Sequence, residues 1–298
     1  MCPEVICIMV IVRIWEGLGN QLFQYAYARA LQLRTGGKVY LDINRTFKIP
    51  LEARGIEREY SLDKFNIQLP VCNDVRKKYF FLEQRNWLQK CLFNLSKDCA
   101  IVPGFYREEN ILYKESLRHV HGNIYLMGWF QNENYFKEYR DTLLQELTPR
   151  HKIRISSFLR NTLKREDTVS VHIRRTDFIK GKNELPVSYY ENAKSYIEKY
   201  IACPQYLIFS DDSEWVRQHM DFGSSAFFVS EENLTDYEEL LVMSRCRNNI
   251  IANSTFSWWG AWLNQNEKKM VIGPKFWRIH GHQDVERNVM PDEWIRVK

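Results

Sequence analysis

The sequence predicts an α/β protein built on parallel sheets with helices on both faces, and three observations support this prediction. Short β-branched runs alternate with helical segments through the second half of the chain, and the connections between them are short. A strand, a glycine turn, a helix and another strand open the chain as a βαβ unit. Polar and charged residues follow several of these strands, at the edge where open α/β sheets bind ligands.

Apolar periodicity, Gly and Pro place the individual elements. In the first half we expect strands at 6–14, 38–43 and 123–128, with helices at 22–33 and 134–147. Residues 44–122 carry little pattern beyond helical fragments at 79–95. Pro149 with the basic run after it indicates a linker or the start of a bridging helix. In the second half we expect strands at 168–173, 206–209, 226–229, 249–252 and 270–272, a helix after Asp212 and a helix at 258–266. Two further helices begin with capping boxes, Ser188 with Glu191 and Thr235 with Glu238.

Length and composition indicate two ordinary domains, which we place at 1–150 and 151–298. A hydrophobic content of 45% with 27% charged residues predicts a folded chain. The net charge of +5 suits an acidic small molecule or an anionic membrane surface and is too small to indicate nucleic acid. Seven cysteines without a C-x-x-C spacing indicate reduced thiols. The apolar run at 5–14 is too short to span a bilayer, so we expect a cytoplasmic protein with room for peripheral membrane contact.

The first glycine turn contains Gly17 and Gly19, but Leu22 stands where a dinucleotide fingerprint needs its third glycine. This argues against a nicotinamide-dependent oxidoreductase. Asn20 and Gln21 either present their amides at the sheet edge or begin the helix as its cap and first turn.

Two consecutive arginines, Arg174 and Arg175, follow the strand at 168–173 and open the next loop, because unpaired guanidinium groups are costly inside a buried strand. Guanidinium forks match phosphate oxygens, so this loop suits a phosphate or diphosphate; the alternative is a pair of surface salt bridges.

A second polar loop, Asn253-Ser254-Thr255-Phe256-Ser257, precedes a helix and directs backbone N–H groups toward an anion. Ser254 and Thr255 are equally suited to be plain N-caps. The tryptophans that follow, Trp258, Trp259 and Trp262, suit core packing better than ligand stacking.

Asp211 and Asp212 follow the strand at 206–209 and have two interpretations. They could hold Mg²⁺, or they could simply favour the start of a helix. Since the two arginines can neutralise a diphosphate, we expect no metal and assign these carboxylates to a base or a ribose. No hydrolase, zincin or P-loop motif is present in the sequence.

At these residues the chain resembles the alpha-1,2-fucosyltransferases of glycosyltransferase family 11. The matching segments are 17–26, 128–131 ahead of Tyr135-Phe136, 172–177, 209–212 and 253–263, in the same order over most of the chain. The resemblance implies the GT-B fold, in which two Rossmann-like domains face each other across a cleft. It implies GDP-L-fucose in the C-terminal domain, a beta-galactoside acceptor toward the N-terminal one, inversion and no metal. Because we see no membrane anchor, the chain is more similar to the soluble bacterial members of the family. We therefore expect at most a peripheral contact with the inner membrane.

The resemblance also suggests roles for individual residues. Arg174 and Arg175 would stabilise charge on the β-phosphate as GDP leaves, with the 253–257 loop on the phosphates and Asp211 or Asp212 on the guanosine. His172 would orient the nucleotide or lie satisfied in the core, and Asn20 and Gln21 would approach the donor from the other domain. Phe178 replaces a tyrosine common in the family.

The base that takes the acceptor proton is left open. Asp177, Glu16 and Glu133 are candidates, and Asp177 could instead pair with an arginine. Fucosyl transfer with another linkage or acceptor, and a binding module without turnover, remain alternative functions.

Overall fold

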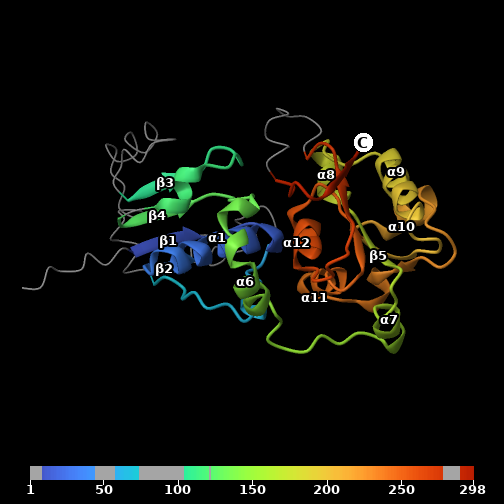
Figure 1. Cartoon of the computed structure of the whole chain (residues 1–298), viewed down its shortest axis with the longest axis horizontal. Coiled ribbons are helices and arrows are strands. Elements are labelled where there is room, and N and C mark those ends of the chain that lie inside the picture. The colour runs from blue at the N-terminus through green and yellow to red at the C-terminus, as the bar shows by residue number, and fades with distance from the viewer. Residues whose placement is uncertain (1–8, 44–57, 74–103, 121, 278–288) are drawn as a thin grey trace, which may run out of the picture. The chain divides into compact units, whose positions relative to one another are not determined.

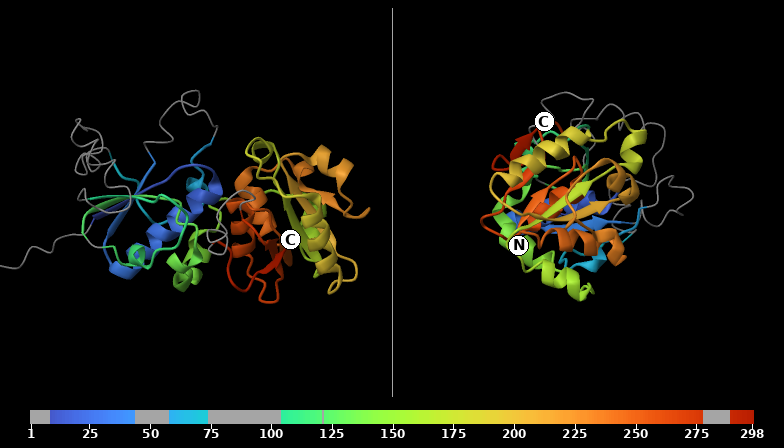
Figure 2. Two further views of the ribbon diagram at one scale, coloured as in Figure 1. Left: turned by 90° about the horizontal axis from the view of Figure 1, so that it is seen from above. Right: turned by 90° about the vertical axis from the view of Figure 1, so that its right-hand side faces the viewer.

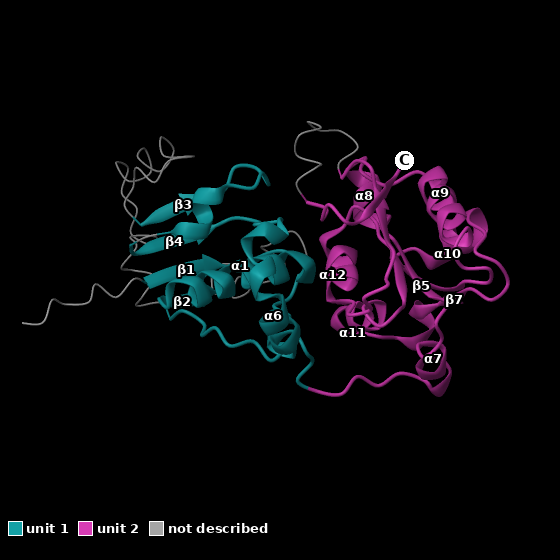
Figure 3. Ribbon diagram, in the orientation of Figure 1, with its two compact units in different colours: residues 1–150 teal, residues 151–298 magenta. Residues whose placement is uncertain are grey.

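The computed structural model describes residues 9–43, 58–73, 104–120, 122–277 and 289–298. It divides into two compact units, residues 1–150 (unit 1) and 151–298 (unit 2), which Figure 3 colours separately. Each unit contains one sheet, and within the described residues every strand pair of both sheets is parallel. The α/β class with parallel sheets is therefore confirmed.

The sheet of unit 1 has the order β2-β1-β4-β3. Its strands are β1 (Met9–Arg13), β2 (Lys38–Asp42), β3 (Phe105–Arg107) and β4 (Ile124–Met127). β1 and β4 are neighbours in this sheet although they are more than a hundred positions apart in the chain, and they pair from Val10 with Ile124 to Val12 with Leu126. Because the two strands are parallel, the segments that follow them emerge side by side at the carboxyl edge of the sheet, where open α/β sheets bind ligands.

Helix α1 (Leu18–Thr35) follows β1 and begins earlier than the predicted residue 22. Gly17 is its N-cap in an extended conformation, and Gly36, with φ 66°, closes it in the left-handed conformation that glycine favours. The apolar spacing could not show the first turn, because the first turn contains Gly19 and Asn20. Asn20 and Gln21 consequently lie inside the helix rather than in a loop.

The predicted helix at 134–147 is wrong in its first half. Two 3₁₀ turns, η3 (Glu133–Tyr135) and η4 (Lys137–Tyr139), precede the short helix α6 (Arg140–Glu146). The Asn132 side chain accepts a hydrogen bond from the Asn134 N–H, which favours a turn over a continuing helix. Unit 1 also contains η1 (Leu62–Lys64) and η2 (Glu115–His119). The helical fragments predicted at 79–95 lie outside the described residues.

The sheet of unit 2 has the order β10-β9-β8-β5-β6-β7. Its strands are β5 (Thr168–Ile173), β6 (Gln205–Ser210), β7 (Phe227–Phe228), β8 (Asn248–Ile250), β9 (Val271–Pro274) and β10 (Ile295–Val297). Numbered along the chain, this is the 3-2-1-4-5-6 order of a Rossmann fold, with its switch point between β5 and β8. Unit 2 is thus a Rossmann-like domain, and β10 was not predicted.

Helices cover both faces of this sheet, with α9 and α10 on one face and α11 and α12 on the other (Figures 1 and 2). The helices are α7 (Ser157–Thr162), α8 (Thr176–Lys180), α9 (Val187–Glu198), α10 (Ser213–His219), α11 (Asp236–Met243) and α12 (Thr255–Leu263), with the 3₁₀ turn η5 (Val229–Glu232) after β7. The capping box of Thr235 and Glu238 is confirmed. That of Ser188 is wrong, because the helix starts one residue earlier with Pro186 as its N-cap.

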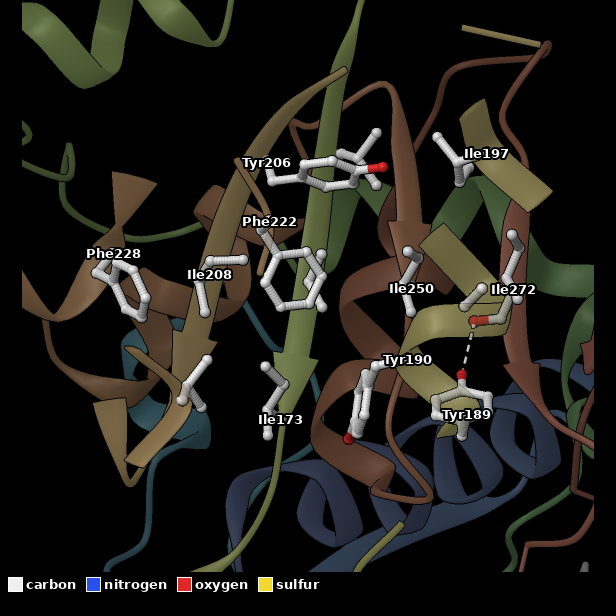
Figure 4. Close-up of a cluster of buried hydrophobic side chains, with 14 residues drawn as sticks. Ile173, Tyr189, Tyr190, Ile197, Tyr206, Ile208, Phe222, Phe228, Ile250 and Ile272 are labelled. Carbon is white, nitrogen blue, oxygen red and sulfur yellow. Dashed lines mark hydrogen bonds between the residues drawn. The ribbon is translucent and has the colours of Figure 1, made fainter. Parts of the chain in front are cut away.

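One part of the hydrophobic core of unit 2 lies between α9 and the sheet (Figure 4). β5 is buried along its whole length, as expected for a strand covered on both faces. Tyr189 brings a hydroxyl into this core and donates it to the carbonyls of Ile251, at 2.6 Å, and Ile272, at 3.4 Å. These bonds connect α9 to the residue that follows β8 and to a residue within β9.

Candidate active site

The carboxyl end of β5 brings the two predicted arginines to the switch point of unit 2. The strand ends at Ile173, so Arg174 and Arg175 begin the connection to α8, as predicted. In the register of β5 and β6, His172 pairs with Phe209 and Ile173 with Ser210. Continuing this register by one residue sets Arg174 beside the start of the loop after β6.

Arg174 is held between two carboxylates. Its Nε and NH2 atoms donate to the two carboxylate oxygens of Asp177 at 2.9 and 3.0 Å, and its NH1 lies 3.1 Å from an oxygen of Asp211. The side chain of Arg174 keeps 23% of its surface exposed. Its charge is therefore neutralised within unit 2 and still accessible to an anion. Asp177 forms the ion pair that the sequence left open as an alternative to proton transfer.

Arg175 is held differently, by one carboxylate and one aromatic face. Its Nε donates to Asp212 at 3.2 Å, and its guanidinium carbon lies 3.2 Å from the ring centroid of Trp215. A guanidinium stacked on a tryptophan is fixed in direction, and the attraction between cation and ring adds to the ion pair. The first turn of α10 thus positions Arg175.

Asp211 and Asp212 organise the backbone as well as the arginines. Asp211 accepts hydrogen bonds from the N–H groups of Arg175 and Thr176 and from the Thr176 hydroxyl, at the start of α8. Asp212 is the N-cap of α10 and accepts from the Trp215 N–H at 3.3 Å. Both carboxylates thus hold the arginine loop, and their predicted contact with guanosine stays a prediction. In the parts of the chain that the structure describes, no three His, Cys, Asp or Glu side chains converge as a metal site would require.

Two buried polar atoms lie on the segments at the switch point. His172, 5% exposed at the end of β5, has an Nδ1 atom without a hydrogen-bond partner among the described residues. Asn253, 4% exposed just after β8, donates its amide to the Asn183 carbonyl at 2.9 Å, but its Oδ1 has no partner there. Buried polar atoms are nearly always paired, so two such atoms at one sheet edge indicate a place where a ligand or water completes the bonding.

His172 is neutral in this environment. Burial, and then the charge of Arg174, lower the pKa of its imidazole to about 3, against a small opposing effect of Asp211. The ring centroid lies 5.5 Å from that of Phe256. The neutral His172 imidazole can thus donate a hydrogen bond to a ligand or accept one, but it cannot act as a cation near neutral pH.

The predicted polar loop after β8 is mostly the first turn of α12. Ser254 is the N-cap without a side-chain capping bond, and Thr255, Phe256 and Ser257 are helical. The helix therefore starts three residues before the predicted Trp258, because its first turn is too polar for the apolar pattern to reveal. The buried Ser257 hydroxyl donates to the Ser254 and Ala252 carbonyls, at 3.2 and 3.4 Å.

The tryptophans of α12 belong to the core, as expected. Trp258, Trp259 and Trp262 are at most 3% exposed, and they pack on one another with ring centroids 5.0 to 6.2 Å apart. These side chains pack α12 against the rest of unit 2.

The predicted site residues of unit 1 divide into two kinds. Gln21 is fully buried, donates its amide to the carbonyls of Glu16 and Glu59 at 2.8 and 2.7 Å, and accepts from the Ser61 N–H at 3.0 Å. These bonds fix the Gln21 side chain within unit 1, and its predicted contact with the donor stays a prediction. Asn20 is half-buried, donates to the Glu16 carboxylate and accepts from Gln131 at 2.8 Å.

The sequence analysis did not identify several residues that contact the candidate site residues at the carboxyl edges of the two sheets. Trp215 could have been found, because it stands three residues after Asp212, where an N-cap bonds to the helix backbone. Trp15, Trp129 and Gln131 follow β1 and β4, but nothing in the sequence shows that these strands are neighbours. Within the described residues, no helix is long and apolar enough to cross a membrane.

Known proteins resemble this chain over nearly all of its length. The alpha-1,2-colitosyltransferase of Escherichia coli is 27% identical over 97% of this chain and 99% of its own. The O-antigen biosynthesis glycosyltransferase WbnK of Escherichia coli is 29% identical over 94% and 98%. The human galactoside alpha-(1,2)-fucosyltransferase 1 is 22% identical over 82% of this chain and 62% of its own.

Solved structures are similar at lower levels. The fucosyltransferase NodZ from Bradyrhizobium has 15% sequence identity and a TM-score of 0.43, over 85% of this chain and 91% of its own. The model of glycosyl transferase family 11 matches residues 8–298. This match spans the carboxyl edges of both sheets and the arginine loop, and the chain therefore belongs to glycosyl transferase family 11.

Proposed function

We propose that the protein transfers L-fucose from GDP-L-fucose to the 2-hydroxyl of a terminal beta-galactoside, with inversion and without a metal. The observation that carries this proposal is the paired Arg174 and Arg175 at the switch point of unit 2. Two guanidinium groups at the carboxyl end of β5, in a glycosyltransferase, suit the diphosphate of a nucleotide sugar.

The reaction is a displacement at the anomeric carbon of fucose. The bond from this carbon to the β-phosphate oxygen breaks, and its electron pair leaves with GDP. A new bond forms from the galactose 2-oxygen, whose proton passes to a base. Negative charge therefore grows on the β-phosphate, where fixed guanidinium groups stabilise the transition state more than the ground state.

The carboxylates of the arginine loop have a defined part in this proposal. Asp212 and Trp215 keep Arg175 in one orientation, and Asp211 holds the backbone at the start of α8. Asp177 is 48% exposed, so it can give up the fork of Arg174 when the diphosphate arrives. In this assignment Asp177 is a temporary partner of Arg174.

The phosphates and the nucleoside would meet the remaining predicted groups of unit 2. The Asn253 Oδ1 and His172 Nδ1 atoms suit hydrogen bonds to the donor, because both are buried without a partner among the described residues. Ser254 and Thr255, at the start of α12, offer N–H groups to a phosphate oxygen. Unit 1 would take the acceptor.

Colitosyl transfer is the second candidate, and it rests on the 27% identity with the alpha-1,2-colitosyltransferase. Colitose is L-fucose without its 3-hydroxyl. An enzyme that hydrogen-bonds this hydroxyl prefers fucose, since loss of the bond leaves a buried polar group unpaired, whereas a site without such a bond accepts both sugars.

The test measures GDP release with lactose as acceptor, in excess EDTA. GDP-fucose, GDP-colitose and UDP-galactose serve as parallel donors, and NMR of the product gives the linkage. Release with GDP-fucose, unaffected by EDTA and absent with UDP-galactose, supports the proposal. Preference for GDP-colitose favours the second candidate. Loss of activity in EDTA contradicts the metal-free reaction, and binding of GDP-fucose with no transfer to any galactoside identifies a binding module.

A further inference from the structure

In unit 1, the loops that leave the neighbouring parallel strands β1 and β4 contact each other at the carboxyl edge of the sheet. The Trp15 indole N–H donates to the Gly128 carbonyl at 3.2 Å, across 113 positions of sequence. The Gln131 amide reaches the Asn20 side chain at 2.8 Å, in the first turn of α1. The segments after the two strands therefore form one connected edge.

Glu16 lies at the centre of this edge. The Trp129 indole N–H is 3.2 Å from both of its carboxylate oxygens, and the Asn20 amide donates to one of them. A carboxylate offers about four acceptor positions, so these bonds leave capacity for a hydroxyl from a ligand. The side chain is half-buried, and it keeps surface open to solvent.

The backbone of Glu16 is in an unusual conformation. Its φ of 64° is in the left-handed region, which costs a non-glycine residue free energy and persists where the surroundings enforce it. Gln21 contributes to this by donating to the Glu16 carbonyl at 2.8 Å. Strain of this kind concentrates at functional sites, and here it occurs at a carboxylate on the carboxyl edge of the sheet.

Two tryptophans flank the carboxylate. The rings of Trp15 and Trp129 have centroids 5.2 Å apart, with 36° between their planes, and both side chains are half-buried. The Arg13 guanidinium lies 5.6 Å from the Trp15 centroid. Tryptophan faces pack on the apolar faces of sugar rings, while carboxylates and amides bond their hydroxyls. The combination suits a saccharide.

A buried carboxylate holds the second of these loops in place. Glu108 is 2% exposed and accepts hydrogen bonds from the N–H groups of Trp129 and Phe130, at 2.6 and 3.0 Å. Phe130 itself has a φ of 51°. Glu108 thus fixes the backbone at Trp129. This backbone in turn positions the Trp129 indole for its hydrogen bond to Glu16.

We propose that Trp15, Glu16, Asn20, Trp129 and Gln131 form the saccharide-binding site of this protein and that Glu16 takes the proton of the bound hydroxyl. The assignment of proton transfer rests on the proposed function. As the hydroxyl oxygen bonds to the anomeric carbon of the donor, its proton passes to a Glu16 oxygen, and solvent removes the proton after the product leaves. Burial raises the pKa of Glu16, against the lowering effects of Trp129, Asn20 and Arg58, and a raised pKa makes a carboxylate a better base.

The test uses the full-length protein, with Glu16→Gln as the principal variant. Glutamine keeps a carbonyl to accept from Trp129 but cannot take a proton. We expect kcat for transfer to lactose to fall at least a hundredfold, with unchanged GDP affinity and an unchanged circular dichroism spectrum. Glu115→Gln, on the surface of the same unit, is the matched control and should retain kcat. Retention of kcat by a folded Glu16→Gln variant would overturn the base assignment.

The pH profile separates proton transfer from a merely structural effect. In the wild type, kcat should fall on the acid side as Glu16 is protonated. Glu16→Asp should retain this limb at reduced kcat, and Glu16→Gln should lose it. Because Glu108 also titrates near this edge, Glu108→Gln is tested alongside and should retain the limb. If Glu108→Gln removes the limb and Glu16→Gln keeps it, the assignment is wrong.

Binding without donor tests the site independently of the proposed function. Saturation-transfer difference NMR with methyl β-D-galactopyranoside should show contact with the wild type, a weaker signal with Trp129→Phe, and the wild-type signal with Glu115→Gln. This holds even if GDP-fucose is not the donor, in which case the proposed function fails and the site stands. Absence of saturation in the wild type, or an unchanged signal in Trp129→Phe and Trp15→Phe, would overturn the site.

Discussion

Arg174 and Asp177 are joined by two parallel hydrogen bonds, at 2.9 and 3.0 Å, three positions apart in the chain. With Asp211 on Arg174 and Asp212 on Arg175, two guanidinium groups face three carboxylates. In the proposed reaction, an incoming diphosphate would therefore compete with Asp177, which already bonds both sides of the Arg174 fork.

Replacement of Asp177 measures this competition. We expect Asp177→Asn to lower the Kd for GDP about two- to tenfold, since the amide leaves the arginine fork free. If Asp177 is a partner of Arg174 and not the base, kcat should stay within about tenfold of the wild type. Isothermal titration and steady-state rates check both expectations. A loss of kcat by a thousandfold, with tight GDP binding, would return the base role to Asp177.

Arg175→Lys tests the need for a planar, stacked cation. Lysine keeps the charge but loses the fork and the stacking on Trp215. We expect kcat to fall about 10²- to 10³-fold, the range seen when one donor to developing charge is removed. Steady-state kinetics with saturating GDP-fucose give the effect. Trp215→Phe preserves an aromatic face, so it should lose less than Arg175→Lys; the reverse order would contradict the stacking argument.

The buried Nδ1 of His172 predicts an effect on donor binding. His172→Leu removes the group and should raise KM for GDP-fucose about three- to tenfold, the value of one ordinary hydrogen bond. His172→Asn can place an amide near the Nδ1 position and should recover part of the loss. Because the pKa of His172 is held at about 3, neither variant should change the pH profile between pH 5 and pH 8. Equal KM values in all three proteins would remove His172 from the site.

Glu108 predicts a pH dependence of stability. Burial raises the pKa of Glu108 to about 7 from its ordinary value of 4.5, so the folded state binds more protons than the unfolded state between these values. The free energy of unfolding therefore falls as pH rises through this window. Glu108→Gln should be more stable than the wild type at pH 8, by on the order of 1–3 kcal/mol, and no more stable at pH 4. Urea unfolding at several pH values measures the difference.

Glu108→Ala is the matched opposite. It leaves the N–H groups of Trp129 and Phe130 without their acceptor and opens a cavity, so it should destabilise the protein at every pH. A Glu108→Gln variant that is less stable than the wild type at pH 8 would contradict this prediction. It would show that the charged carboxylate is stabilised by a nearby positive charge.

Gly260 tests the packing of α12 against α11. A methyl group at this position would lie 2.4 Å from the Met243 sulfur, well inside contact distance. Gly260→Ala should therefore destabilise the protein by about 1–3 kcal/mol. Met243→Ala together with Gly260→Ala should cost less than the sum of the two single variants, because the smaller side chain makes room. Additive losses in thermal unfolding would contradict the contact.

The sequence could predict much of unit 2 because local chemistry and fold agree there. β5 is β-branched and buried, the arginines could not continue it, and the Thr235 capping box could be read directly. The starts of α1 and α12 could not be found, since their first turns are polar and their N-caps, Gly17 and Ser254, form no side-chain capping bond.

The site of unit 1 was out of reach for a different reason. Glu16 was one candidate among three, and what distinguishes it depends on the pairing of β1 with β4, more than a hundred positions apart. A single sequence gives no signal for such a long-range contact. For unit 2, the aspartates were identified as site residues, but their hydrogen bonds to the arginine loop depend on the register of β5 and β6.

The strand order of unit 2 also determines when its site is completed during synthesis. Ser170 on β5 accepts from the Asn249 amide on β8 at 2.7 Å, although the two residues are 79 positions apart. Until β8 has left the ribosome, β5 has an open edge, and Asn253 and the first turn of α12 do not yet exist. The arginine loop and its aspartates lie within a much shorter stretch, so they can form first. The nascent chain should therefore bind GDP only after Asn253 and the start of α12 have emerged.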